Sequence, residues 1–231
     1  MFKYFISIAA ILTCFLSTAQ GENEIKKDSI IYKQTYGLRT GIDLASLIRT
    51  SIDDEYTGFQ ILADYRLSKR LYVAGEIGNE SLDRKSERID YKTSGSFIKA
   101  GVDYNMYQNW LDMDNMIYAG ARLGYANMSQ TLHRYDYNTD NTYFPVYTNV
   151  VDREFSGLHM IWLEIQLGIK VEVLNNVYLI ANFQLKHQLT EKTPDNFDNL
   201  YVPGYGKTFD TGNIGVGYSY GIMYRIPFFK K

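Results

Sequence analysis

The chain has 231 residues, a formal net charge of −2 at pH 7, 21 tyrosines, 4 prolines and a single cysteine. This near-neutral balance, without a large basic patch, argues against a nucleic acid as partner. One cysteine excludes a disulfide framework within the chain. The length suits one domain of the all-β barrel class.

The N-terminus has the features of an export signal. Lys3 supplies a positive charge, and residues 5–16 form an apolar run that is too short to cross a membrane as a helix. Small residues follow at 17–19, so we predict a signal peptide over residues 1–19. Its removal takes away Cys14, which lies inside the apolar run rather than at its end, where a lipoprotein cysteine is expected.

Beyond a polar periplasmic lead-in at residues 20–34, the sequence predicts one β-barrel domain over residues 35–231. Its main signal is alternation of apolar and polar residues over segments of about ten residues, which is typical of barrel strands. The predicted strands are 35–44, 57–67, 71–80, 95–106, 115–127, 157–173, 177–187 and 214–226.

The connections between these strands alternate in length. Short ones fall at 68–70, 107–114 and 174–176, whereas long polar ones fall at 45–56, 81–94, 128–156 and 188–213. Short periplasmic turns and long extracellular loops are the pattern of outer-membrane barrels.

The two faces of the predicted strands differ in chemistry. One face is uncharged and rich in Leu, Ile and Val in every strand, whereas the other carries acids and bases in equal numbers. A soluble periplasmic β-protein would bury the first face and expose the second, so parity alone leaves that alternative open. The export signal and the aromatic residues near strand ends favour the membrane, because such residues form interfacial girdles. The aromatic residues are Tyr36, Phe59, Tyr65, Tyr72, Tyr104, Trp110, Tyr125, Tyr224, Phe228 and Phe229.

We therefore predict an all-β, eight-stranded antiparallel up-and-down transmembrane β-barrel with a filled polar interior. Eight strands leave a lumen narrow enough for side chains to fill. Buried charges are costly unless they are paired, so an interior ion-pair network is expected and a general porin is disfavoured. The predicted network comprises Arg39, Asp43, Asp64, Arg66, Glu76, Lys99, Asp103, Arg122, Glu164, Lys170, Glu172, Lys186 and Arg225.

Several stretches resemble an uncharacterised family of small outer-membrane barrels from Bacteroidota, domain of unknown function 6048. The resemblance covers nearly the whole mature chain and implies the fold and the outer-membrane location, but it brings no activity or catalytic residue. The chain ends in Lys230 and Lys231 after Phe229, which displaces the terminal aromatic residue expected for recognition by the assembly machinery. The stretches are 36–44 (YGLRTGIDL), 75–80 (GEIGNE), 99–105 (KAGVDYN), 167–173 (LGIKVEV) and 196–204 (NFDNLYVPG).

Two chemical sites are weighed and set aside. Asp136, Asn138 and Asp140 have the spacing of a calcium loop, but Asn141 replaces the glycine and Tyr147 the closing glutamate, so turn-forming residues explain the run better. A lipid hydrolase would need a nucleophile beside a base. Ser156 and His159 fall on opposite strand parities, with His133 as another candidate base. We predict no metal, no cofactor and no catalytic residue.

The loops hold the stronger functional signal, because aromatic residues among polar ones suit contact with a protein or a glycan. Folding of these loops over the barrel mouth is the equally weighted alternative. The sequence thus favours a monomeric, non-enzymatic barrel with an envelope-structural or surface-binding role, among outer-membrane lipids and lipopolysaccharide. A lipid-modifying enzyme and a narrow pore are the alternatives. The loop residues are Tyr135, Tyr137, Tyr143, Phe144, Tyr147, Phe197, Tyr201 and Tyr205.

Overall fold

The computed structural model describes residues 35–107, 114–137, 143, 145–195, 197–208 and 212–230. The predicted signal peptide (1–19) and lead-in (20–34) lie outside the described residues. No helix in the described ranges is long and apolar enough to cross a membrane.

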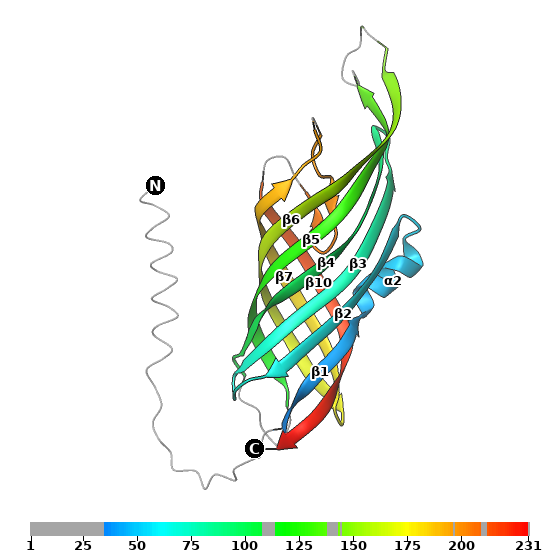
Figure 1. Cartoon of the computed structure of the whole chain (residues 1–231). Coiled ribbons are helices and arrows are strands. Elements are labelled where there is room, and N and C mark those ends of the chain that lie inside the picture. Colours follow the sequence, from blue (N-terminus) through cyan, green and yellow to red (C-terminus); the bar gives the residue numbers. More distant parts are fainter. Residues whose placement is uncertain are drawn as a thin grey trace. The chain divides into compact units, whose positions relative to one another are not determined.

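Eight strands form a closed antiparallel barrel in the order β1-β10-β7-β6-β5-β4-β3-β2, as the sequence predicts (Figure 1). Successive barrel strands pair with one another, with β7 pairing with β10, and β10 also pairs with β1 to close the ring, so this sheet leaves few unpaired edges. A short hairpin of β8 (Tyr201–Val202) and β9 (Gly206–Lys207) precedes β10. The barrel strands are β1 (Thr35–Asp43), β2 (Tyr56–Arg66), β3 (Leu71–Lys85), β4 (Ile89–Asn105), β5 (Met116–Tyr137), β6 (Tyr147–Leu174), β7 (Val177–Lys192) and β10 (Ile214–Lys230).

Burial alternates along each strand as the predicted parity requires. In β6, Glu164 and Gln166 are buried inside the barrel, whereas the alternating residues Ile165 and Leu167 are exposed on its outer surface. The period of two places successive side chains on opposite faces of the sheet. The outside of the barrel is thus an uncharged aliphatic belt that includes Ile61, Val73, Ile77, Ile98, Val102, Leu123, Leu163, Ile165, Leu167, Leu179 and Leu185.

Aromatic residues gather where the two ends of the barrel domain meet. Tyr36 of β1 stacks on Phe229 of β10 with ring centroids 5.1 Å apart, and Tyr65 lies 6.3 Å from Phe228. The predicted girdle residues in the described ranges are at least partly exposed, with one exception, and Trp110 lies outside the described residues. Tyr72 is buried inside the barrel, because it has the inward parity of β3.

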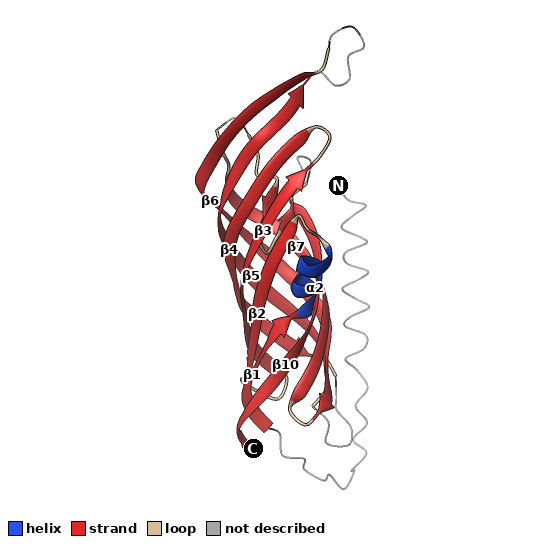
Figure 2. Ribbon diagram, turned by 90° about the vertical axis from the view of Figure 1, so that its right-hand side faces the viewer, coloured by secondary structure: helices blue, strands red, loops and turns tan. Residues whose placement is uncertain are grey.

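The predicted long loops 81–94 and 128–156 are mostly strand, which corrects the sequence-based boundaries. The β5–β6 ladder continues to the pair Tyr137 and Tyr147, and β3 pairs with β4 as far as Lys85 and Asp90 (Figure 2). Backbone hydrogen bonds extend these hairpins beyond the aliphatic belt. Alternation disappears there because polar residues suit both faces, so the sequence signal for a strand is lost.

A second correction concerns residues 44–52, which form the helix α2 (Leu44–Ile52) instead of a strand end and a loop. Asp43 caps it: the carboxylate accepts a hydrogen bond from the backbone N–H of Ser46 at 2.9 Å. Ile48 and Ile52 are exposed one turn apart on one face of the helix. The cap and this spacing are a helix signal that the surrounding strand pattern masks.

Replacing Asp43 with alanine is expected to lower the free energy of unfolding by about 1 kcal/mol, the usual cost of an N-cap. Asparagine at this position keeps an acceptor oxygen and is the matched control. Both are measured by denaturant titration of the refolded protein. An equal loss in the two variants would contradict the capping role.

Candidate functional site

Buried ion pairs cross the middle of the barrel. Asp64 lies 2.6 Å from Nε of Arg39 and 2.7 Å from Nζ of Lys170. Asp103 lies 3.0 Å from Lys170 and 2.6 Å from Nη2 of Arg122. All five side chains are almost fully buried, so each acid is stabilised by two bases in place of water.

The same chain of alternating charges continues through Glu76 and Lys99 to Glu164. Glu76 is 3.5 Å from Nε of Arg122 and 3.1 Å from Lys99, and Glu164 is 3.3 Å from Lys99. Gln166 donates hydrogen bonds to both glutamates, at 3.0 and 2.6 Å. We call this set the central chain: Arg39, Asp64, Lys170, Asp103, Arg122, Glu76, Lys99 and Glu164.

A second polar group lies nearer the start of β1 and depends on a residue that the sequence assigned to a turn. Asp114 accepts from Arg66 at 2.6 Å and also pairs with Arg225, which contacts Glu172 at 3.1 Å. Tyr178 donates its hydroxyl proton to Asp114 at 3.3 Å. Parity inside a strand cannot identify Asp114, because it precedes the first residue of β5.

Asp43 and Lys186 are not joined to the predicted network by any ion pair within the described ranges. Asp43 ends β1, where it caps α2 and accepts the hydroxyl proton of Ser219 at 2.7 Å. Lys186 donates to the backbone carbonyls of Gly204 and Tyr205 at 2.8 and 3.1 Å. Asp43 therefore stabilises α2, and Lys186 binds the backbone of residues 204 and 205. Neither residue belongs to the central chain.

Residues 197–208, which we call the plug, fold back into the mouth of the barrel. The hydroxyl of Tyr201 donates to the Glu80 carboxylate at 2.6 Å, and the backbone N–H of Gly204 donates to the same carboxylate at 3.0 Å. Burial, with Glu80 alongside, raises the pKa of the Tyr201 phenol far above its ordinary value, so this hydroxyl remains a donor. Gln130 of β5 bonds to Leu200 N–H at 3.0 Å.

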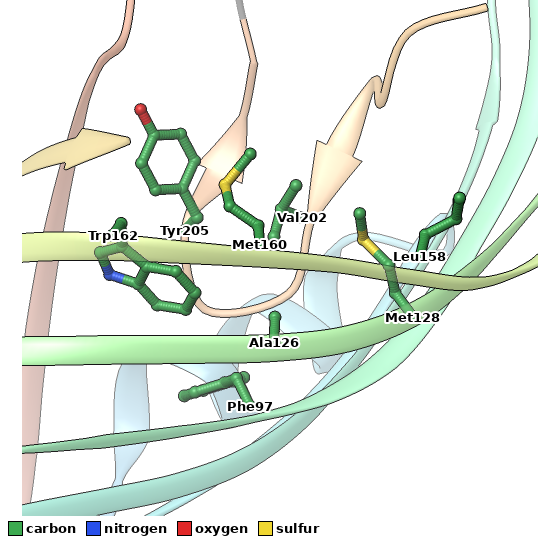
Figure 3. Close-up of a cluster of buried hydrophobic side chains, with 8 residues drawn as sticks. All are labelled: Phe97, Ala126, Met128, Leu158, Met160, Trp162, Val202 and Tyr205. Carbon is green, nitrogen blue, oxygen red and sulfur yellow. The ribbon is translucent and has the colours of Figure 1, made fainter. Parts of the chain in front are cut away.

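Val202 and Tyr205 of the plug pack against strand residues in an apolar cluster inside the barrel, which corrects the expectation of a polar interior (Figure 3). Trp162 of β6 meets Tyr205 edge to face, with ring centroids 5.8 Å apart. The cluster residues of β4, β5 and β6 have the inward parity, beyond the charged layer of the same strands. The cluster comprises Phe97, Ala126, Met128, Leu158, Met160, Trp162, Val202 and Tyr205.

The plug also changes the prediction for the loop aromatics. Tyr201 and Tyr205 are buried, so they fold over the mouth and are not exposed to a partner. Phe197 stacks on Phe155 with centroids 6.2 Å apart. Their burial follows from Glu80 and the apolar cluster, which provide partners that the local sequence does not reveal.

The β5–β6 hairpin carries the exposed aromatic residues. Tyr137 stacks on Tyr147 with centroids 5.3 Å apart and lies 6.3 Å from Tyr135. Tyr143 is 95% exposed, and Phe144 lies outside the described residues. The ladder of the hairpin thus presents a row of tyrosines beyond the aliphatic belt.

A cavity of about 290 Å³ opens between α2, β10 and the plug. Arg49 of α2, Lys186 of β7 and Glu80 of β3 line it with charge, and Val216 and Tyr218 of β10 line it with apolar surface. The cavity is close to the smallest size usual for small-molecule sites.

The residues weighed for catalysis and calcium are not assembled into such sites among the described positions. His133 contacts Asp152 at 2.7 Å, and His159 stacks on Tyr125. Asp136 accepts from Arg134 at 3.0 Å, so its carboxylate already has a cationic partner. Asn138 and Asp140 lie outside the described residues.

Three solved structures align with most of this chain at low identity. The attachment invasion locus protein Ail of Yersinia pestis is 10% identical with a TM-score of 0.40, and the alignment covers 83% of this chain and 97% of Ail. Neisserial surface protein A is 15% identical with a TM-score of 0.42, covering 83% and 96%. A major outer membrane protein from Thermus thermophilus is 12% identical with a TM-score of 0.41, covering 83% and 98%.

No curated protein matches the chain. The sequence profile of Domain of unknown function (DUF6048) matches residues 1–231, from the first residue to the last. The chain therefore belongs to the DUF6048 family.

Proposed function

We propose that this chain is a monomeric outer-membrane β-barrel with a non-enzymatic role, either binding a partner at the cell surface or contributing to the structure of the envelope. The observation that carries the proposal is the inverted burial of the barrel: charged side chains lie inside, and an uncharged aliphatic belt lies outside. Hydrocarbon is the solvent that favours this arrangement, and a closed barrel satisfies its backbone polar groups internally. The predicted signal peptide supports export to that membrane.

The interior argues against the pore alternative. The central chain crosses the lumen with contacts of 2.6–3.5 Å, and the plug fills the mouth above it. Side chains that fill an eight-stranded barrel leave no wide aqueous path. Conductance measured in planar bilayers is expected to show no steady ohmic steps.

For the lipid-enzyme alternative, the histidines weighed as bases have other partners among the described residues. His159 stacks on the aromatic ring of Tyr125 on the outer surface, and His133 contacts Asp152 on the exposed hairpin. A nucleophile within hydrogen-bond reach of a base is the minimum for this chemistry. Incubation with labelled lipid A or phospholipid in micelles is expected to release no product.

Membrane residence is tested by cell fractionation and by the solubility of the purified mature protein. We expect recovery with the outer-membrane fraction and a requirement for detergent, because the aliphatic belt is exposed. Recovery as a monodisperse protein without detergent would show that the apolar face is shielded from solvent, and would overturn the proposal.

Surface binding is tested on the exposed tyrosines of the hairpin. Replacing Tyr137, Tyr143 and Tyr147 together with serine is expected to weaken binding to a panel of purified bacterial and host glycans by about tenfold or more, since aromatic anchors dominate such contacts. Tyr107→Ser is the matched control, because this exposed tyrosine precedes the turn between β4 and β5 at the opposite end of the barrel. Binding that falls equally in the control, or in neither variant, would contradict a role of the hairpin.

A further inference from the structure

The β1–β10 ladder of the barrel wall stops where β1 ends. The last β1–β10 pair is Asp43 with Gly221, and the described β10 residues Ile214–Tyr220 continue without a strand partner on that edge. Their other edge stays paired with β7, from Ile214 opposite His187 to Tyr220 opposite Ala181. In this stretch the wall between β10 and β2 is completed by α2, not by a strand.

Helix α2 is fastened to β2. The Thr50 hydroxyl accepts the backbone N–H of Gly58 at 2.8 Å and lies 3.2 Å from the Gly58 carbonyl, so it substitutes for a strand partner at the β2 edge. Toward β10, the contact that α2 makes through its cap is the Asp43–Ser219 hydrogen bond. The weaker seam of the wall therefore lies between α2 and β10, and we call it the slot.

The cavity described above lies at the slot and connects two chemically different surfaces. Its outer lining includes Phe183, Val216 and Tyr218, which are exposed on the apolar face of the barrel. Its inner lining includes Lys186 and Glu80, which face the interior beside the plug. A molecule bound there would have an apolar part toward the membrane and a polar part toward the lumen.

The inner end of the slot favours an anion. Lys186 is only 6% exposed and has no carboxylate within ion-pair distance in the described part of the chain, whereas every member of the central chain is ion-paired. Its two hydrogen bonds, to the Gly204 and Tyr205 carbonyls, leave one of three ammonium donors for a ligand. A buried cation gains strongly from an opposite charge.

Space beside this ammonium is kept by a glycine. A Cβ atom added to Gly217 of β10 would lie 2.9 Å from Nζ of Lys186 and 2.9 Å from Oε1 of Gln184. A larger residue would fill the approach to the charge. The charged lining residues are the bases Arg49, Lys99 and Lys186 and the acids Asp43 and Glu80, so bases exceed acids by one. A singly charged carboxylate therefore suits the site better than a doubly charged phosphate.

We propose that the slot binds a long-chain fatty acid from the outer leaflet, with its carboxylate on Lys186 and its alkyl chain leaving between α2 and β10 toward the membrane. The charge of Lys186 selects the carboxylate of the fatty acid, and the exposed apolar residues at the outer end of the slot select its alkyl chain. That the fatty acid comes from the outer leaflet rests on the proposed function above. That the slot binds a fatty acid in micelles is independent of it.

Trp162 is a built-in reporter, because it packs on Tyr205, which lines the cavity. The only other tryptophan is Trp110, so Trp110→Phe is used as the parent protein. The mature protein is refolded in a neutral detergent and titrated with 2-bromohexadecanoate, whose bromine next to the carboxylate quenches tryptophan at short range. We expect saturable quenching by this acid and little by 2-bromohexadecan-1-ol, which lacks the charge.

Two variants test separately the charge of Lys186 and the space between α2 and β10 through which the alkyl chain leaves. Lys186→Met is expected to weaken binding by about tenfold or more, whereas Lys186→Arg, which keeps the charge, retains most of it. Ala45→Leu, on the α2 residue that lines the cavity, is expected to weaken binding through bulk alone with Lys186 intact. Ser51→Leu, on an exposed position of the same helix, is the matched control and should bind like the parent.

The thermal unfolding midpoint of each variant is recorded in the same detergent, so that a loss of folding is seen directly. Equal quenching by the acid and the alcohol, or parent-like affinity in both Lys186→Met and Ala45→Leu, would overturn the fatty-acid site. Such a result leaves the fractionation test of membrane residence unaffected. Loss of the membrane fraction with intact binding in micelles would instead overturn the proposed location.

Discussion

Replacing Arg122 with methionine is expected to lower the free energy of unfolding by about 3 kcal/mol or more, the usual cost of breaking a buried ion pair from one side. Arg122 is buried and contacts Asp103 at 2.6 Å and Glu76 at 3.5 Å, and it also donates to the Val102 carbonyl at 2.9 Å. Its removal leaves the central chain with one more acid than base. Lys170 and Lys99 still pair with these two carboxylates, so the loss is partial.

The measurement is a denaturant titration of the protein refolded into vesicles, with a double-mutant cycle as control. Arg122→Met combined with Asp103→Asn removes one charge of each sign and restores neutrality. The double variant should therefore be more stable than the sum of the two single losses implies. Wild-type stability in Arg122→Met, or strict additivity in the cycle, would contradict the coupling within the central chain.

Replacing Leu167 with arginine is expected to cost about 2–4 kcal/mol of folding free energy in vesicles, the range for a base near the bilayer midplane. Leu167 is 56% exposed on the outer surface and lies in β6 between Ala119 of β5 and Phe183 of β7. Its strand neighbours on the same face, Ile165 and Ile169, are exposed as well. In water such a substitution on an exposed residue would cost almost nothing.

Val173→Arg is the matched control, because Val173 lies on the same face of the same strand next to the turn into β7. A base at this depth reaches the interface, and a loss of about 0–1 kcal/mol is expected. Equal stability of Leu167→Arg and the wild-type protein in vesicles would mean that this face does not contact hydrocarbon. Equal losses in both variants would place the two residues at the same depth.

The amino-acid sequence by itself determined the barrel and the assignment of its two faces. Alternation is a local property, because the strand period of two fixes which side chains share a face as soon as the strand exists. The inward position of Arg39, Asp64 and Arg122 and the outward position of Leu167 could therefore be predicted. The short turns at 68–70 and 174–176 could be predicted for the same local reason.

Only the tertiary structure decided which interior groups meet. Asp64 and Lys170 are far apart in sequence yet 2.7 Å apart, since closing the sheet brings β2 and β6 to face each other across the lumen. Asp114 joins Arg66 and Arg225 from outside the strands. Pairing across a barrel depends on register and closure, and neither is a property of one segment.

The plug and α2 depended on tertiary contacts as well. Tyr201 and Tyr205 have the composition of exposed loop residues, and they are buried because Glu80 and the apolar cluster around Trp162 offer partners inside the mouth. Residues 44–52 form a helix where a β1–β10 ladder ends. Local alternation thus set the wall of the barrel, whereas the long-range contacts that closure creates set what fills it and where its wall is weakest.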